Sequence, residues 1–406
     1  MKHLALAFLL AFMCLGTTFS QSVHSDSLPA QSRHKPAQRD MGDVFNSVFS
    51  KKTAAADTSD IKDTKKHFSI VPAVGYTLQT GFAGIVSGNM SYYVDTTRAS
   101  KMSTVTTSVT YSQYQQTIIP LLVDLWTKGN KLNFISDLRF IDYPSDIYGL
   151  GGRTDPNQGH TIDFTGMKVH QTVMAAVSKN VYLGGGYFFD KFWSIKAIDP
   201  ETRRINNIIT RELGSNETAS SLAGRFLYDS RQNQINPQQG FYGSVTYRNS
   251  MKWLGSDENW QSVQVDARTY FHFPASSKNV LAFWMFDWMT FGGKVPYLLL
   301  PSTGWDDNYN TGRGYIQGRF RGKQMYYAET EYRYNITRNG LLGGVVFGNL
   351  QSFSGELSTE YSELLPGFGA GLRLKLNKHS GANLCVDYGF GKNGSRGFFV
   401  NLGEVF

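Results

Sequence analysis

From residue 67 to the end of the chain, apolar and polar side chains alternate with a period of two. In the stretch WQSVQVDARTYFHF, one face carries Val263, Val265, Ala267, Thr269, Phe271 and Phe273, and the other carries Ser262, Gln264, Asp266, Arg268, Tyr270 and His272. Because successive side chains of a β-strand point to opposite faces, this stretch predicts a strand with one apolar side and one wet side. The same alternation returns along the chain without an intervening helical domain, and it predicts an all-β fold.

The length and composition of this region favour a transmembrane antiparallel β-barrel over a soluble sandwich. Strands of about ten residues, separated by turns rich in Gly, Asn and Asp, are long enough to cross a bilayer at a tilt. The 28 Phe, 22 Tyr, 7 Trp and 41 Gly suit apolar outer faces, aromatic girdles and tight turns. At roughly twenty residues for a strand and its connection, residues 67–406 allow about sixteen strands, the even number that bacterial barrels use.

The last stretch, GFFVNLGEVF, ends in an aromatic residue. Phe398, Val400, Leu402 and Phe406 share one face if the strand continues to the end. This pattern resembles the C-terminal signal of outer-membrane barrels, which the barrel assembly machinery handles during biogenesis. We therefore expect these four residues to form the apolar face of the last strand.

The first twenty residues predict a signal peptide. A short positive start is followed by the apolar stretch LALAFLLAFMCLG, and the segment 1–20 ends in small residues suited to cleavage. Thirteen apolar residues are too few for a helix that spans a bilayer, which needs about twenty. The chain is expected to be exported and, as a barrel, to reside in the outer membrane of a Gram-negative bacterium among outer-membrane lipids.

Residues 21–66 form a polar stretch that we expect to be a periplasmic linker. Near 41–52, the segment MGDVFNSVF places apolar side chains at helical spacing and predicts a short N-terminal amphipathic helix. Two interpretations stay open: a transient helix in a tail, or a plug helix that docks on the barrel. The candidate docking residues are Val44, Phe45, Val48 and Phe49.

The segment TGRGYIQGRFRGK, residues 311–323, concentrates glycine, cationic and aromatic residues. It does not fit a phosphate-binding P-loop, because Gln317 and Gln324 stand where that motif needs Gly and Ser or Thr. A nucleic-acid patch is disfavoured too, since the excess of 40 Lys and Arg over 32 Asp and Glu is spread along the chain. We expect no nucleic-acid partner.

Followed by MYYAETEYRY, this segment resembles the Arg-Gly-aromatic loop of the bacterial surface-antigen superfamily, the BamA/TamA-like assembly and secretion barrels. The match lies in Arg313, Gly314 and Tyr315. Two further segments, 227–247 and 369–391, are similar to the family's Asp-x-Arg, Pro-x-x-Gly strand pair and to its penultimate hairpin. The three matches occur in the family's order, which is more specific than any one of them.

The resemblance implies that this sixth loop folds back into the barrel and that its arginine contacts acidic residues on the wall. Strand parity puts Glu329, Glu331 and Asp387 on the inner face, and we expect Glu331 first and Asp387 second as partners of Arg313. Asn349 stands where the family has an acidic residue. Arg321, in the same segment, is expected to contribute little to stability.

The linker is too short for even one POTRA domain, so we expect a family member that lacks them. No G-x-S-x-G nucleophile motif occurs, no cluster of Cys and His suggests a metal, and we expect neither an enzyme nor a cofactor. Asp306, Asp307, Asn308 and Asn310 resemble part of a calcium loop, but Thr311 replaces its required Gly.

Three functions remain open. The first is assistance to the insertion or translocation of a protein or lipid, the client being unknown. The second is a passive diffusion pore. The third is a structural or surface-interaction barrel without cargo.

Overall fold

The computed structural model describes residues 38–44, 64–77, 80–96, 100–198, 213–355, 361, 363–378 and 380–406. The expected signal peptide at 1–20 and most of the expected linker lie outside the described residues. In the described part of the chain, no helix is both long and apolar enough to cross a membrane.

The described residues form one antiparallel sheet of seventeen strands, with four short 3-10 turns and a helical turn at residues 41–44. The strands are β1 His67–Thr77, β2 Gly81–Tyr93, β3 Met102–Ser112, β4 Thr117–Trp126, β5 Leu132–Asp142, β6 Ser145–Ile147, β7 His160–Ser178, β8 Val181–Ile198, β9 Glu217–Asp229, β10 Gly240–Ser250, β11 Trp260–His272, β12 Val280–Phe291, β13 Gln324–Asn335, β14 Leu342–Phe353, β15 Leu365–Lys375, β16 Asn383–Gly391 and β17 Arg396–Leu402. The 3-10 turns are η1 Lys128–Asn130, η2 Lys252–Leu254, η3 Tyr297–Leu299 and η4 Lys392–Gly394.

Strands that follow each other in sequence pair with each other, as in an up-and-down meander. Among the described strands, β5 and β6 both pair with β7, so the three-residue β6 continues β5 at the same place in the sheet. Seventeen described strands therefore occupy sixteen positions (17 − 1 = 16). The prediction of an all-β antiparallel barrel of about sixteen strands is confirmed.

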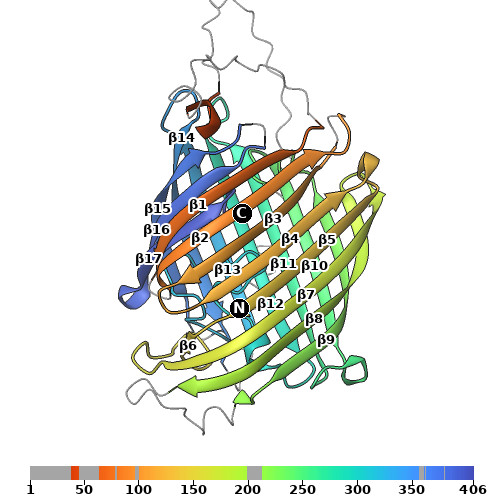
Figure 1. The fold of residues 1–406 in the computed structure, drawn as a ribbon, viewed down its shortest axis with the longest axis vertical. Helices are drawn as coiled ribbons and strands as arrows, with labels where there is room; N and C mark the ends of the chain where they lie inside the picture. Colours follow the sequence, from red (N-terminus) through yellow and green to blue (C-terminus); the bar gives the residue numbers. More distant parts are fainter. Residues whose placement is uncertain are drawn as a thin grey trace, which may run out of the picture. The chain divides into compact units, whose positions relative to one another are not determined.

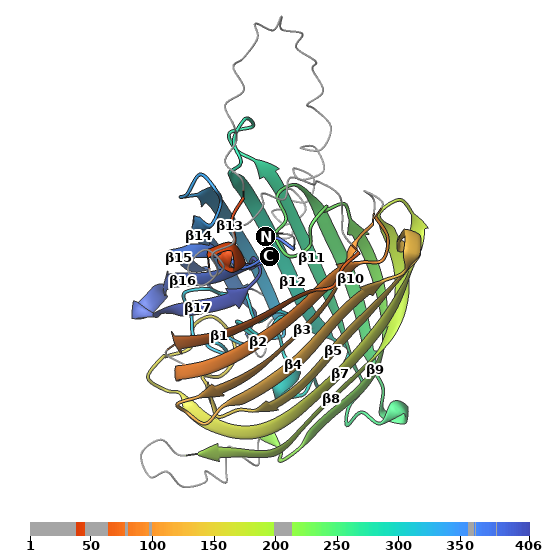
Figure 2. The same cartoon turned by 45° about the horizontal axis from the view of Figure 1, so that its top comes forward.

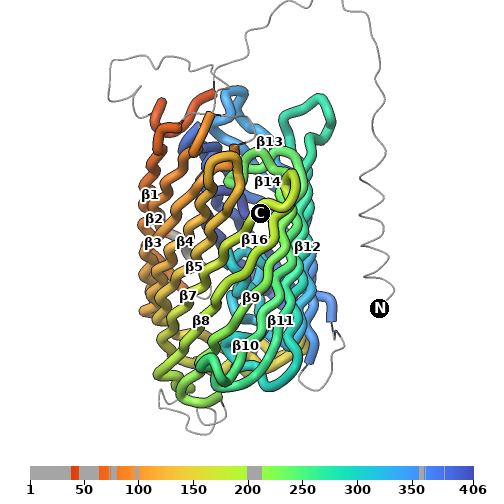
Figure 3. The backbone as a smooth tube through the Cα atoms, turned by 90° about the vertical axis from the view of Figure 1, so that its right-hand side faces the viewer, coloured from red at the N-terminus to blue at the C-terminus, as the bar shows by residue number. Residues whose placement is uncertain are grey.

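The sheet curls into a barrel whose strands are steeply tilted (Figures 1 and 3). Its first and last strands, β1 and β17, lie beside each other, with Cα atoms within 8 Å. Hydrogen-bonded registers join β1 to β2 and β16 to β17, but among the described residues none joins β17 to β1. We call this junction the seam.

The outer face of the sheet is apolar, as the alternation predicts. Phe271 of β11 is 41% exposed, whereas Tyr270 beside it is buried on the inner face. Val245 and Tyr247 of β10 and Leu372 of β15 are also exposed. A barrel in lipid needs this arrangement, because its apolar side chains meet acyl chains and its polar ones line the interior.

The two ends of the barrel differ. One end carries the helical turn 41–44, the turn 336–341 between β13 and β14, and the turn 376–382 between β15 and β16. We call this end the N-terminal rim (Figure 2). The opposite end, the loop rim, carries the long connection 292–323 between β12 and β13. That connection is the sixth on its side.

The C-terminal residues differ from the expectation. β17 ends at Leu402, and Gly403 follows with a φ of 94°. Phe398 remains on the outer face, but Phe406 is buried, with its ring 5.3 Å from that of Trp284 on the inner face of β12. The four residues therefore do not share one strand face, because the chain turns into the interior after Leu402.

Candidate functional site

The connection 292–323, hereafter loop 6, folds into the barrel. Its tip residue Arg313 is only 1% exposed, and Tyr315 and Phe320 are buried in an aromatic cluster with residues of β12, β13 and β14. A cation buried so deeply requires partners that offset its desolvation.

Three wall carboxylates surround the Arg313 guanidinium. Nη2 donates to Glu329 and Glu331 of β13, and Nη1 donates to the Asp387 carboxylate of β16 at 2.5 Å. The structure thus brings Arg313 together with all three acidic residues that strand parity placed on the inner face. Glu329, which we ranked last among them, is in direct contact as well.

The position where the family has an acid is used differently. The Asn349 side-chain amide donates to the Arg313 carbonyl at 2.8 Å, so it holds the loop backbone and not the guanidinium. The Phe347 ring, two residues earlier on β14, lies 3.8 Å from the guanidinium carbon and adds a cation–π contact. The amide at 349 suits a carbonyl partner, which a carboxylate could not bind.

The Arg313 contacts belong to a larger ion-pair network at the base of β13, β15 and β16. Arg333 binds Glu331, and Arg373 binds both Asp387 and Glu404. Burial raises the pKa of Glu404, but Arg373 and Arg333 outweigh this effect, so the pKa of Glu404 lies below its usual range. The arginines of the network are Arg313, Arg333 and Arg373, and its carboxylates are Glu329, Glu331, Asp387 and Glu404.

The backbone of the loop tip packs closely against the backbone of β16, a contact that sequence reasoning missed. A Cβ on Gly389 of β16 would lie 2.7 Å from the Gly314 nitrogen, and one on Gly314 would lie 2.5 Å from the Phe390 carbonyl. Gly314 also has a φ of 107°, a backbone conformation that residues other than glycine rarely adopt. The signal was present as inward-facing glycines on the hairpin 365–391.

Two further arginines of loop 6 are buried at the loop rim. Arg319 donates to the Thr154 hydroxyl and carbonyl, and Arg321 donates to the Tyr297 carbonyl at 2.9 Å. Arg321 is 3% exposed. Arg321 therefore joins two parts of loop 6 and does not lie in solvent, a position that argues against the expectation of a small contribution to stability.

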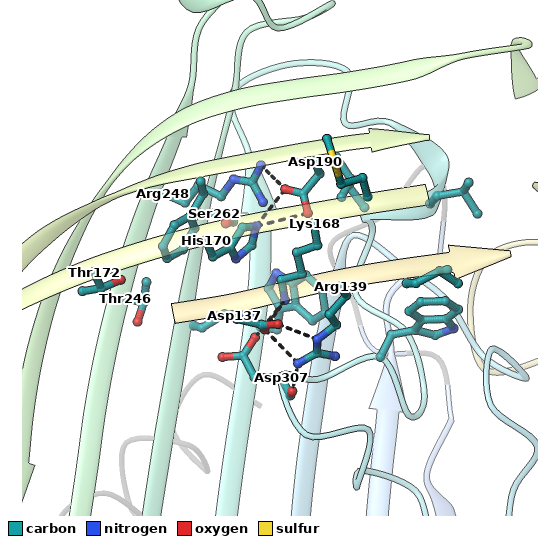
Figure 4. Close-up of a pocket in the computed structure, with 18 of the residues that line it drawn as sticks. Asp137, Arg139, Lys168, His170, Thr172, Asp190, Thr246, Arg248, Ser262 and Asp307 are labelled. Carbon is teal, nitrogen blue, oxygen red and sulfur yellow. Dashed lines mark hydrogen bonds and ion pairs between the residues drawn. The ribbon is translucent and has the colours of Figure 1, made fainter. Parts of the chain in front are cut away.

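A second contact between loop 6 and the wall has the opposite charge arrangement (Figure 4). Asp307 of the loop accepts from Lys168 of β7 at 3.4 Å, and its backbone carbonyl accepts from Arg139 of β5. Asp137 holds both cations, with Lys168 at 3.1 Å. Asp306 beside it binds the backbone nitrogens of Asn310 and Thr311, so its carboxylate stabilises a turn.

Residues 38–44 contact the N-terminal rim. The Asp43 carboxylate binds the Lys378 ammonium at 3.1 Å, and Asp40 accepts from the Lys378 backbone nitrogen at 3.0 Å. Asp40 and Asp43 also cap each other's backbone nitrogens at the start of the helical turn. Val44 is at the end of this turn, whereas Phe45, Val48 and Phe49 of the expected plug helix lie outside the described residues.

The fold and its inserted loop define an outer-membrane β-barrel. The model of the Omp85 superfamily domain matches residues 98–406, and the chain belongs to this superfamily. A search of curated proteins finds no match.

The solved structures similar to this chain include two outer-membrane proteins. CdiB from Acinetobacter baumannii is 12% identical, with a TM-score of 0.51 over 84% of this chain, which spans 60% of the length of CdiB. BamA from Haemophilus ducreyi lacking POTRA domains 1–3 is 15% identical, with a TM-score of 0.49 over 83% of this chain and 69% of that one.

Proposed function

We propose that this barrel assists the insertion or passage of a protein or lipid at the outer membrane, and that the client engages the seam. The observation that carries this proposal is the seam between β1 and β17, whose strands lie side by side without a described hydrogen-bonded register. Backbone N–H and C=O groups at a sheet edge can pair with a strand of another chain.

The interior supports this choice over a passive pore. Loop 6 enters the barrel and is held at its tip, at the loop rim and at its side. A diffusion pore needs an open aqueous channel, which an inserted and ion-paired loop obstructs. Membership of the Omp85 superfamily agrees with a role at the membrane and not with simple diffusion.

Cysteine pairs across the seam test the proposal. Pairs are scanned along residues 69–74 of β1 and 397–401 of β17, and each is compared oxidised and reduced in cells that depend on this gene. We expect oxidation of a seam pair to abolish complementation and reduction to restore it. The matched control joins Val386→Cys to Val400→Cys, which already face each other in the paired strands β16 and β17.

A depletion strain identifies the client class. Outer-membrane proteins and lipids are quantified together as the barrel disappears. Loss of proteins indicates a protein client, and altered lipid content indicates a lipid client. If neither changes while uptake of small solutes falls, the barrel is a pore and the proposal fails.

We further propose that residues 41–52 cap the N-terminal rim in the periplasm. The contacts of Asp40 and Asp43 with Lys378 support this position. Docking a stripe of large apolar side chains stabilises by about 1.5–3 kcal/mol for each one fully buried. Deletion of 41–52 should then raise conductance in planar bilayers; unchanged conductance would indicate a free tail.

A further inference from the structure

A cavity lies between loop 6 and the inner wall formed by β5 and β7 to β11 (Figure 4). It is separate from the Arg313 network, which uses β13, β15 and β16. Its wall side is rich in charged side chains, and Trp305 and Tyr309 of loop 6 cover it from the other side. The arrangement of charge in this cavity carries an inference independent of the insertion proposal.

The wall of the cavity has an excess of positive charge. The permanent cations that line the wall are Arg139, Lys168, Arg225 and Arg248. The wall carboxylates are Asp137 and Asp190. With His170 neutral, the net charge of the wall is therefore 4 − 2 = +2. Asp307 of loop 6 is the third carboxylate and lowers the excess to +1. The loop therefore supplies an anion to a cationic wall.

Asp307 is a loosely held anion. Its side chain is 60% exposed, and its one ion pair among the described residues is with Lys168 at 3.4 Å. The Arg139 contact goes to the Asp307 backbone carbonyl and does not require the carboxylate. The carboxylate could leave this position without breaking the backbone contact.

Two donors of the wall lack an anionic or carbonyl partner. Arg225 donates to the hydroxyls of Ser244 and Tyr242, each at 3.0 Å, and no carboxylate in the described part of the chain lies within ion-pair distance of it. The indole nitrogen of Trp260, which is buried in the same cavity lining, has no hydrogen-bond acceptor among the described residues. Buried donors usually have acceptors, so the unpaired indole nitrogen favours a ligand rich in oxygen. Arg225 favours an anionic one, because the hydroxyls that it contacts do not balance its charge.

We propose that this cavity binds an oxyanion, a phosphoryl or carboxylate group of a ligand, and that the Asp307 carboxylate occupies the same cationic wall when the ligand is absent. Arg225 and Lys168 supply positive charge to the oxyanion, and guanidinium groups bind such groups through directed hydrogen bonds. Because Asp307 repels the incoming anion, loop 6 and ligand compete for the wall.

The test uses the full chain in detergent. Tryptophan fluorescence is titrated with inorganic phosphate or with acetate at ionic strength held constant with chloride. The Asp307→Asn variant should bind about tenfold more tightly than wild type, because a like charge beside the ligand is removed. Arg225→Gln should bind about tenfold more weakly. This variant leaves no carboxylate unpaired, so it should fold.

Asp155→Asn, an exposed carboxylate on another loop, is the matched control and should bind like wild type. Folding of each variant is checked by its shift on unboiled gels. Saturation by phosphate alone assigns the site to phosphoryl groups, and saturation by both ions extends it to carboxylates. The proposal is overturned if neither ion saturates the signal, or if Asp307→Asn binds no more tightly than wild type.

Discussion

Loop 6 meets the barrel wall at two places with opposite charge. At its tip, the loop supplies the cation, and Arg313 is 1% exposed among Glu329, Glu331 and Asp387. At its side, the loop supplies the anion, and Asp307 is 60% exposed beside Lys168. The tip contact is buried and contains three ion pairs, whereas the side contact is exposed and contains one ion pair of the Asp307 carboxylate.

Burial decides what each contact can do. A buried charge that loses its partner keeps the full desolvation penalty, so opening a buried ion pair costs a large free energy. An exposed pair gives typically about 0–1 kcal/mol and exchanges with water and ions. The tip is therefore a fixed anchor, whereas the side contact can open.

Arg313→Ala should lower the free energy of unfolding more than any other substitution in loop 6. Removal of the guanidinium takes the cation away from Glu329 and leaves Glu331 and Asp387 with Arg333 and Arg373 alone. We expect a loss of about 3–5 kcal/mol in the free energy of unfolding. Chemical unfolding of the refolded barrel in detergent measures it. Loop 6 should also become accessible to protease in intact cells.

Lys323→Ala is the control within the same stretch, because Lys323 is exposed. We expect it to change stability by less than about 0.5 kcal/mol. Equal effects of the two substitutions on stability and on protease protection would mean that the segment 311–323 acts as a basic surface loop.

Arg321→Ala should have the next largest effect. The side chain is buried and donates to the Tyr297 and Leu300 carbonyls, so its loss leaves buried acceptors unpaired at about 1–3 kcal/mol. Unfolding in detergent gives the loss directly. A variant as stable as wild type would show that these carbonyls find water, and that the rim of loop 6 is wetter than its tip.

Strand parity made the fold and part of the site predictable. The period of two in β13 and β16 determines which side chains face inward, so Glu329, Glu331 and Asp387 could be placed on the inner face from local sequence. Their meeting with Arg313 was implied by the resemblance to the surface-antigen superfamily and not by the period. The pattern does not say how far a strand continues. Phe406 fits the parity of β17, yet the turn at Gly403 carries it into the interior.

Contacts between distant segments could not be derived in this way. Arg139, Lys168 and Asp307 come from β5, β7 and loop 6, and no local period relates them. The same holds for Gly314 against Gly389, where the tertiary approach of two backbones requires the absence of a side chain. The burial of Arg321 could not be foreseen, because glycine-rich basic segments usually lie in solvent.

Glu404 gives the anchor network a pH dependence. Its pKa is lowered in the folded barrel relative to about 4.3 in an unfolded chain. The unfolded state therefore binds more protons at acid pH, and the contribution of Glu404 is present above its unfolded pKa and lost as pH falls through its folded pKa. Glu404→Gln removes this ionisation while keeping an acceptor for Arg373.

The difference in unfolding free energy between wild type and Glu404→Gln should shrink as pH falls from 7 to about 3. Unfolding curves at several pH values measure it. A difference that stays constant with pH would mean that the pKa of Glu404 is the same in the folded and unfolded states, and that its ion pairs with Arg373 and Arg333 do not stabilise the barrel.

Asp307→Asn should have the smallest effect on stability, less than about 1 kcal/mol, because the carboxylate is mostly exposed. The amide keeps an acceptor for Lys168, and the backbone contact with Arg139 does not involve the side chain. Unfolding in detergent at low and high salt measures the effect, which should decrease further as salt screens the pair. A loss comparable to that of Arg313→Ala would place Asp307 among the fixed anchors and remove the distinction between the dry tip and the wet side of loop 6.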